Sequence, residues 1–469
     1  MEHENRKIAA SRTGSALFLL CAAQLMIMLD TSIVHIALPS LRTDLGASAR
    51  ELQWVAAAYA LAFGGFMLPG GRLGDLFGRR RMLIIGLALF TAASAGGGLA
   101  GGIGALIAAR AVQGLGAALA APAVLSLLSS VFPEGERRNR ALGVLGAVSA
   151  SGFIAGLVLG GMLTAGLGWR WVFFVNIPIG AALIILIPAI LRESVRLRQP
   201  ADLAGTVTVT AGLALLAYAC SAIGTSGPEF FSAGMLFLLS VMLLAVFIAV
   251  ESRVRHPLTP LRVFKSRSLA GALAAAAAFG AIMGPALYML TFYMQNILGY
   301  GPLAAGFAFL PQEIAAIASS RFIGKYVSKF GTRNILAGGM VCFLAGALAL
   351  SGISAEGSYW QILPGMILIG FGIACVIVAG AAAAMAETDL REKGLVSGLW
   401  NTAPQIGSAV GLALLVTVAD AFAGGALRQH AGPSAGVAAA WVSGFKAAFI
   451  AAAGIAAAGL WGVLALLRK

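Results

Sequence analysis

The sequence is 469 residues long, with 59% hydrophobic and only 11% charged residues, and its mean hydropathy is +0.92. This share of charged residues is too low to cover the surface of a water-soluble protein of this size. The composition therefore excludes a soluble multidomain protein and indicates a protein embedded in a lipid bilayer. The net charge of +14 is expected on cytoplasmic loops, and no nucleic-acid partner is predicted. The four cysteines lie in apolar stretches, so neither a disulfide framework nor a metal site is predicted.

Apolar stretches long enough to cross a bilayer recur along the whole chain. Scanning for about 20 apolar residues predicts fourteen spans and an all-α polytopic membrane protein. The spans are 16–38, 52–71, 82–100, 104–131, 141–165, 171–190, 202–223, 231–250, 269–294, 302–320, 335–354, 360–382, 395–420 and 443–466. If the N-terminus is inside, the outer loops receive only Arg42, Arg50, Arg170, Arg428 and Lys446. This asymmetry predicts that both termini are cytoplasmic.

Three short patterns occur twice, in the same order. The stretch GRLGDLFGRRR at 71–81 reappears as GKYVSKFGTRN at 324–334, and Gly114–Gly116 matches Gly370–Gly372. The stretch Gly152–Leu157 matches Gly407–Leu412. We therefore predict a six-helix bundle at 1–191, two inserted helices with flanking loops at 192–267, and a second six-helix bundle at 268–469. Parallel six-helix repeats with a substrate site near the midplane are a transporter design.

Several motifs resemble those of the major facilitator superfamily. The 71–81 stretch is similar to its signature loop between helices two and three, and Arg110–Gly116 (RAVQGLG) resembles its helix-four arginine motif. Leu29–Pro39 (LDTSIVHIALP) and Gly152–Gly161 (GFIAGLVLGG) resemble motifs of the fourteen-helix drug:proton antiporters, and Trp169–Pro178 has the same family pattern. The resemblance implies proton-coupled multidrug efflux, and hence antibiotic resistance, by alternating access across the cytoplasmic membrane.

Four residues are candidates for proton coupling: Asp30, Arg110, Glu313 and His35. A charge at the centre of a membrane helix costs about 2.5–3.5 kcal/mol, so Asp30 is expected to face the bundle interior, as a proton carrier or in a structural ion pair. Helices one and four are neighbours in the superfamily, so we expect Arg110 to pair with Asp30 or with the proton route near it; the alternative is simple packing. Glu313 either attracts a cationic substrate, carries a proton or forms a hydrogen bond at a proline break. His35 lies about 140° around the helix from Asp30, either titrating or hydrogen-bonded at the interface.

The candidate residues of a cytoplasmic gate lie in the first loop: Gly71, Arg72, Gly74, Asp75, Gly78, Arg79 and Arg80. We expect Asp75 to hold one conformation of the gate by accepting hydrogen bonds from a facing helix N-terminus. The resemblance also implies an antiporter-type helix five, marked by Gly152, Gly156, Gly160 and Gly161. Two aromatic residues, Tyr288 and Trp400, are candidates for the wall of a substrate cavity.

Other classes of protein fit the sequence less well. Residues 71–81 lack the strand context and the terminal Lys-Ser/Thr of a phosphate-binding loop, and no set of catalytic residues is recognisable, so an enzyme is not predicted. No ATP-binding cassette is recognisable either, so we expect a proton gradient as the energy source, without a cofactor. The expected partners are a small-molecule substrate and protons, and we expect a monomer. The alternative within transporters is a proton-coupled carrier for one physiological metabolite.

Overall fold

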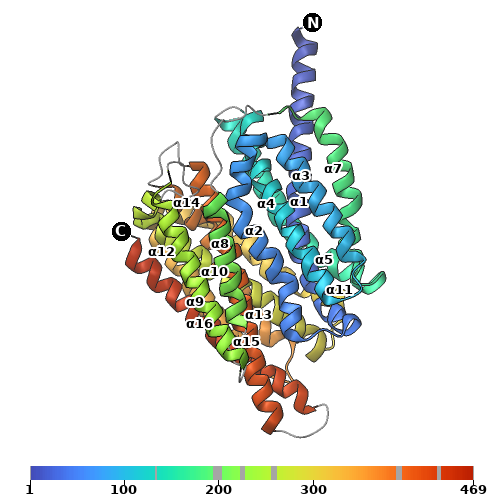
Figure 1. Ribbon diagram of the computed structural model, residues 1–469, viewed down its shortest axis with the longest axis vertical. Coiled ribbons are helices and arrows are strands. Elements are labelled where there is room, and N and C mark those ends of the chain that lie inside the picture. Colours follow the sequence, from blue (N-terminus) through green and yellow to red (C-terminus); the bar gives the residue numbers. More distant parts are fainter. Residues whose placement is uncertain are drawn as a thin grey trace.

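The computed structural model describes residues 2–132, 135–193, 203–221, 228–254, 261–386, 393–429 and 435–467, and every structural statement below refers to these. Within them the chain forms a bundle of long helices and contains no strand (Figure 1). The fold class predicted from composition, an all-α polytopic membrane protein, is confirmed.

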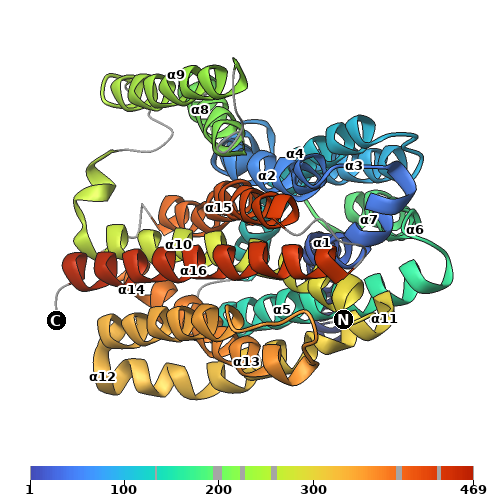
Figure 2. The same ribbon diagram turned by 90° about the horizontal axis from the view of Figure 1, so that it is seen from below.

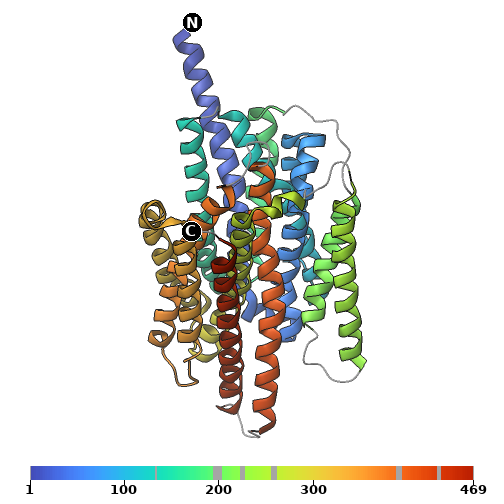
Figure 3. The ribbon, with the colours of Figure 1, turned by 90° about the vertical axis from the view of Figure 1, so that its left-hand side faces the viewer.

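The first half of the chain forms seven helices. They are α1 (Glu2–Leu45), α2 (Ala49–Phe77), α3 (Arg79–Gly98), α4 (Ile103–Val131), α5 (Glu136–Gly166), the short α6 (Trp171–Phe174) and α7 (Asn176–Ile190). Two further helices follow, α8 (Leu203–Ser221) and α9 (Pro228–Glu251). Figure 3 shows this pair, in green, along one side of the bundle.

The second half begins with the short 3-10 helix Leu261–Lys265 and α10 (Arg267–Phe292). The following elements are a π-helix (Tyr293–Ile297), α11 (Pro302–Ala308), α12 (Leu310–Leu350), α13 (Tyr359–Cys375), a second π-helix (Val376–Gly380), α14 (Ala381–Met385), α15 (Lys393–Gln429) and α16 (Ala435–Leu466). The helices α10, α13 and α15 each contain an internal proline, which membrane helices tolerate more readily than soluble ones.

Twelve helical runs of the described chain are long and apolar enough to cross a membrane. One of them, Pro302–Leu350, is 49 residues long and contains a kink at Gly331, and the apolar helix Val207–Cys220 is shorter than the runs that qualify. Dividing the long run at its kink and adding α8 would give the fourteen spans expected. The count of fourteen therefore stays a prediction.

Two glycines at matching positions of the repeat share an unusual backbone conformation. Gly78 separates α2 from α3 with φ 107°, and Gly331, its counterpart in the second loop, has φ 82°. L-residues with side chains rarely adopt such angles, so glycine is required where each helix pair reverses direction. The duplicated sequence pattern thus corresponds to a duplicated turn.

The buried apolar side chains show where the two halves meet. We call the end of the bundle that carries the 71–81 loop the basic face, and the other end the opposite face. Near the basic face, the first half has a separate core that includes Leu20, Leu83 and Leu128. Near the opposite face, the C-terminal part of α1 (29–41) shares one core with α10, α12, α13, α15 and α16. The halves are therefore packed together at the opposite face.

Candidate functional site

Asp30 lies in the middle of α1 with no exposed surface, surrounded by donors from two other helices. Its Oδ2 is 2.6 Å from Nη1 of Arg110 on α4. Its Oδ1 accepts hydrogen bonds from Nδ2 of Asn176 on α7, at 2.9 Å, and from Nε2 of Gln113 on α4, at 3.2 Å. The ion pair expected between Asp30 and Arg110 is present, and two amides complete the shell of the carboxylate.

The guanidinium of Arg110 is as well enclosed as its partner, with only 2% of the side chain exposed. Its Nε donates to the carbonyl oxygen of Val55 at 3.0 Å, and its Nη1 donates to Oε1 of Gln113 at 3.0 Å. The charge also lies 4.2 Å from the ring centroid of Tyr59 on α2, a cation–π contact. A buried charge is tolerated only with such partners, because desolvation of an unpaired ion costs several kcal/mol.

Gln113 extends this network to α3, because its Nε2 also donates to Oγ of Ser94 at 2.7 Å. The network thus joins side chains from α1, α2, α3, α4 and α7, all within the first half. Protonation of Asp30 would remove the negative charge that neutralises Arg110. The arrangement can therefore couple a proton to the relative positions of five helices.

The glycines of helix five set how closely α5 approaches its neighbours. A Cβ at Gly156 would lie 2.5 Å from the carbonyl oxygen of Leu29, one residue before Asp30. A Cβ at Gly161 would lie 2.6 Å from the carbonyl oxygen of Pro302, at the start of α11 in the second half. The motif therefore packs α5 against α1 on one face and against the other half of the chain on another.

Among the described residues, neither of the other two candidates for proton coupling is hydrogen-bonded to the Asp30 network. His35, on α1, is 9% exposed, and its Nδ1 is buried with no partner among the described residues. It is a buried histidine, and its part in proton coupling stays a prediction. Glu313 lies in the first turn of α12, is 8% exposed, and accepts a hydrogen bond from Nε2 of Gln312 at 3.2 Å. It is a second buried carboxylate, in the second half of the chain.

In the gate loop, the carboxylate of Asp75 accepts hydrogen bonds from Nε and Nη2 of Arg79, at 3.1 and 3.0 Å. Nη1 of Arg79 lies 3.4 Å from the carbonyl oxygen of Ser126, near the end of α4. Among the described residues, the partner of Asp75 is thus an arginine one turn further on, not the N-terminus of a facing helix. Asp75 connects α2 to α3 and, through Arg79, to α4.

An acid that the sequence did not single out caps the same turn. The Oε1 and Oε2 atoms of Glu193, just after α7, accept hydrogen bonds from the backbone N–H groups of Arg80 at 3.0 Å and Arg81 at 3.2 Å. These are donors of the first turn of α3, where a negative charge is favoured by the helix dipole. A Cβ at Gly78 would lie 2.6 Å from the carboxyl carbon of Glu193, so glycine also makes room for this cap.

We expect Glu193→Ala to lower the free energy of unfolding by about 0.5–2 kcal/mol, because two N–H groups of α3 lose their acceptor. Thermal unfolding of the purified protein measures this effect. The matched control is Glu51→Ala: Glu51 caps α2 by accepting from Ser48 N at 2.9 Å, away from the gate loop. Both variants should lose similar stability, but only Glu193→Ala should change the transport rate. An unaltered rate in both would make the Glu193 cap purely structural.

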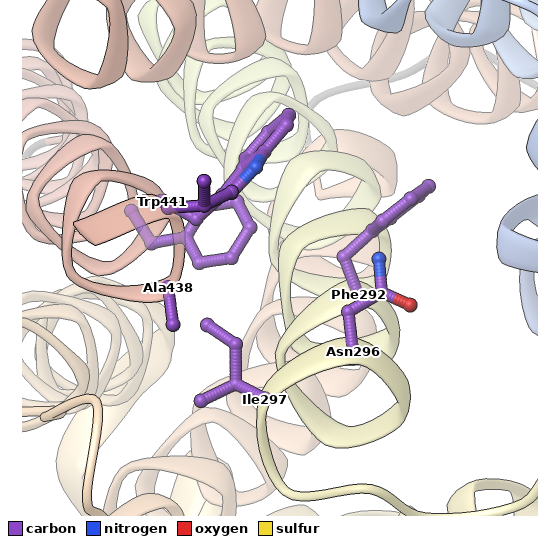
Figure 4. Close-up of a pocket in the computed structure, with 7 residues that line it drawn as sticks. Phe292, Asn296, Ile297, Ala438 and Trp441 are labelled. Carbon is purple, nitrogen blue, oxygen red and sulfur yellow. The ribbon is translucent and has the colours of Figure 1, made fainter. Parts of the chain in front are cut away.

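A cavity of about 230 Å³ lies elsewhere, between the π-helix after α10 and α16 (Figure 4). Its walls are Phe292, Asn296, Ile297, Val437, Ala438, Trp441 and Phe445. Neither candidate cavity residue lines it. Tyr288 is buried against Phe292, with ring centroids 4.8 Å apart, and Trp400 lies against Gly380. The assignment of Tyr288 and Trp400 to a substrate site stays a prediction.

The network includes polar residues that the sequence did not single out as functional. Gln113 and Asn176 both lie inside the stretches that carry the family resemblance, at 110–116 and 169–178. Both are fully buried neutral side chains in apolar helices. A buried amide side chain in a membrane helix needs a hydrogen-bond partner. An amide inside a predicted span was therefore the sequence signal that could have identified both residues.

A bundle of membrane-length helices with a buried ion pair at its centre and a repeated loop defines the class of polytopic membrane transporters. The model of the Major Facilitator Superfamily matches residues 20–412, and the chain belongs to this superfamily. It is 37% identical to the puromycin resistance protein pur8 of Streptomyces alboniger over 451 residues, 94% of this chain and 88% of that protein. It is 38% identical to the cephamycin export protein CmcT of Amycolatopsis lactamdurans over 429 residues, covering 88% and 86%.

A solved structure shares the fold at low sequence identity. It is a bacterial homologue of the human lysosomal transporter Spinster, with a TM-score of 0.72 and 14% identity over 97% of this chain and 96% of that chain. The likeness covers 97% of this chain, so the two proteins share a fold over nearly its whole length.

Proposed function

We propose that this protein exports small hydrophobic or cationic compounds across the cell membrane, in exchange for protons, by alternating access. The observation that carries the proposal is the buried carboxylate of Asp30, held 2.6 Å from Arg110 in the middle of a membrane helix. Such an acid is costly to bury and marks proton pathways in transporters. The pur8 and CmcT relatives, named for puromycin resistance and for cephamycin export, support efflux as the direction of transport.

The coupling follows from the charges. When Asp30 is ionised, its attraction to Arg110 holds α1 against α4; when Asp30 takes up a proton, this attraction is lost and the helices are free to rearrange. Arg110 stays charged throughout, since a guanidinium does not deprotonate in proteins. Glu313, the buried acid of the second half, serves as a second protonation site or as the group that attracts a cationic substrate.

The basic face is the cytoplasmic face in this proposal, with both termini inside, a placement supported by the asymmetric distribution of arginine and lysine. Residues 1–191 and 268–469 are the two moving bundles, and 192–267 contribute the inserted pair. Contacts at the opposite face support a conformation closed toward the outside: Nε2 of Gln295 donates to the carbonyl oxygen of Ile36 at 2.9 Å, and Arg42 lies 4.8 Å from the ring centroid of Trp441. Asp75 and Arg79 then belong to the cytoplasmic gate.

A second candidate function is the export of one metabolite. The relative CmcT, whose name refers to a single compound, cephamycin, supports it. A resistance panel separates the two readings. The chain is expressed in an efflux-deficient bacterium and challenged with diverse antibiotics and cationic dyes, with and without a protonophore. Broad resistance that the protonophore removes is expected. Resistance to a single compound would favour the second reading, and unchanged susceptibility throughout would contradict both.

A further inference from the structure

The two halves of the chain meet along two seams that the internal repeat makes equivalent. Because the loop at 71–81 matches the loop at 324–334, α2 corresponds to the first part of α12. Because Gly152–Leu157 matches Gly407–Leu412, α5 corresponds to α15. The seam between α2 and α15 is therefore the counterpart of the seam between α5 and α12. Each seam faces the surrounding lipid on one side of the bundle unless something covers it.

The first seam is covered by α8, the first of the two inserted helices. Figure 2 shows α8 beside α2 and α15, with α9 outside it. One small buried cluster combines all three helices: Ala60 and Leu61 from α2, Ala217 and Cys220 from α8, and Ala409 and Ala413 from α15. Thr210 Oγ1 of α8 donates to the carbonyl oxygen of Gly65 on α2 at 3.2 Å, and the rings of Trp54 and Tyr218 lie 6.0 Å apart.

As a result, α2 and α15 have almost no exposed residues over most of their length. No residue of α2 between Leu52 and Leu76 is exposed, and in α15 only Asn401 is exposed between Leu395 and Asp420. The outward surface on this side is formed by α9, where Met235 is 72% and Leu238 is 68% exposed, and by part of α8, where Val207 is 64% exposed. The small side chains of the cluster allow close helix contact without interlocking, as membrane helix interfaces require.

Within the part of the chain that the structure describes, no helix covers the second seam near the basic face. It is closed at the opposite face, where a Cβ at Gly306 of α11 would lie 2.5 Å from the carbonyl oxygen of Leu157 on α5. Toward the basic face, α5 exposes mostly small residues: Gly143, Val144, Gly146, Ala147, Ala150 and Ser151. In the second half, α12 exposes apolar residues that include Ile314, Ile317 and Phe322. Figure 2 shows α5 and α12 on the side of the bundle away from α8.

We propose that α8 is a lateral seal that makes access from the membrane one-sided, so that amphiphilic substrates dissolved in the leaflet at the basic face enter between α5 and α12. The inference rests on the proposed efflux of hydrophobic compounds. Such compounds concentrate in the membrane by burying apolar surface there. The packed seam of α2, α8 and α15 leaves them no passage, whereas the small exposed side chains of α5 border an uncovered route. The inserted pair thereby breaks the symmetry of the repeat.

The seal is tested by labelling the full-length protein in liposomes with a lipid-soluble aryl diazirine, followed by residue-resolved mass spectrometry. We expect carbene insertion in 143–151 of α5 and in α9, and none in 52–76 of α2 or 402–420 of α15, the ranges without an exposed residue. Labelling of α2 and α15 at the level of α9 would overturn the seal.

The entry route is tested by Ala147→Trp, which narrows the α5–α12 seam, with Leu238→Trp on the outer face of α9 as the matched control. Inside-out vesicles are given two probes, the membrane-partitioning dye Hoechst and the water-soluble cation ethidium. We expect Ala147→Trp to lower the initial rate for Hoechst several-fold, to lower that for ethidium much less, and Leu238→Trp to change neither.

Equal losses for both dyes, or an unchanged Hoechst rate, would show that substrates reach the cavity from water and would overturn the lateral route. Failure of the unmodified protein to move either dye would instead count against the proposed efflux. The labelling pattern would still decide whether α8 seals its seam, so the two failures are distinguishable.

Discussion

The Asp30→Asn variant is expected to lose proton-driven efflux entirely, down to the rate of vesicles without protein. Asparagine keeps the shape of the side chain and its contacts with Gln113 and Asn176, but it cannot take up and release a proton. Substrate binding should survive, because the change affects the coupling charge and leaves the walls of the bundle intact. Efflux from inside-out vesicles under an imposed pH gradient, together with equilibrium dye binding, measures the two effects separately.

The matched control is Asp44→Asn, near the end of the same helix, where Asp44 accepts hydrogen bonds from Trp169 and Arg170 with about half of its side chain exposed. This variant should transport at the normal rate, since an exposed pair contributes about 0–1 kcal/mol. Asp30→Asn also leaves the charge of Arg110 without its counterion. If the single variant fails to fold, the double variant Asp30→Asn/Arg110→Met, which carries neither charge, decides the point. Gradient-driven efflux by either Asp30→Asn or the double variant would exclude Asp30 as the proton carrier.

The fold was predictable because charge and hydropathy are properties of single segments. A carboxylate or a guanidinium inside an apolar stretch stands out against its neighbours, so Asp30 and Arg110 were visible in the sequence. The neutral members of their network were not. Gln113 and Ser94 are polar residues of a kind that also hydrogen-bond within their own helix, and Ser94 does donate to the carbonyl oxygen of Phe90. Their hydrogen-bond partners depend on which helices lie next to each other in the fold, and no local sequence pattern shows this.

Glu193 shows a different limit. In the sequence it is one acid in a charged stretch after an apolar span. It lies so far from Arg80 along the chain that no helix or strand period predicts a contact between them. Only the return of α7 to the basic face brings its carboxylate to the start of α3. The role of α8 was hidden for the same reason. Its length and hydropathy predicted a span, but the packing of Ala217 in one cluster with Leu61 and Ala409 depends on three segments distant in sequence.

The repeat was predictable in one respect and misleading in another. The match of 71–81 with 324–334 located two turns with the same backbone geometry at Gly78 and Gly331. The side chains around them differ, however. The first loop has the ion pair of Asp75 with Arg79, whereas Ser328 occupies the position of Asp75 in the second loop and donates within its own helix to Gly324. Equivalent backbones thus carry unequal charge networks, which suits a gate that acts on one half.

The ion pair at the centre of the first half is expected to show strong coupling in a double-mutant cycle. Arg110→Met leaves the carboxylate of Asp30 buried without its counterion, and breaking a buried pair in this way costs about 3–5 kcal/mol. Adding Asp30→Asn removes the remaining charge, so the double variant should regain most of the lost stability. Thermal unfolding of the four proteins in one detergent gives the interaction free energy.

The physical reason for the recovery is that desolvation of two ions offsets most of their mutual attraction, while a single buried ion has the cost without the attraction. Asp30 and Arg110 are 0% and 2% exposed, so water cannot screen either charge in the folded protein. The double variant should therefore be nearly as stable as the unmodified protein and yet inactive in proton-driven efflux. Stability losses that simply add would mean that Val55, Gln113 and Tyr59 hold the guanidinium without help from Asp30. The pair would then have no part in holding α1 against α4, and the proposed switch would fail.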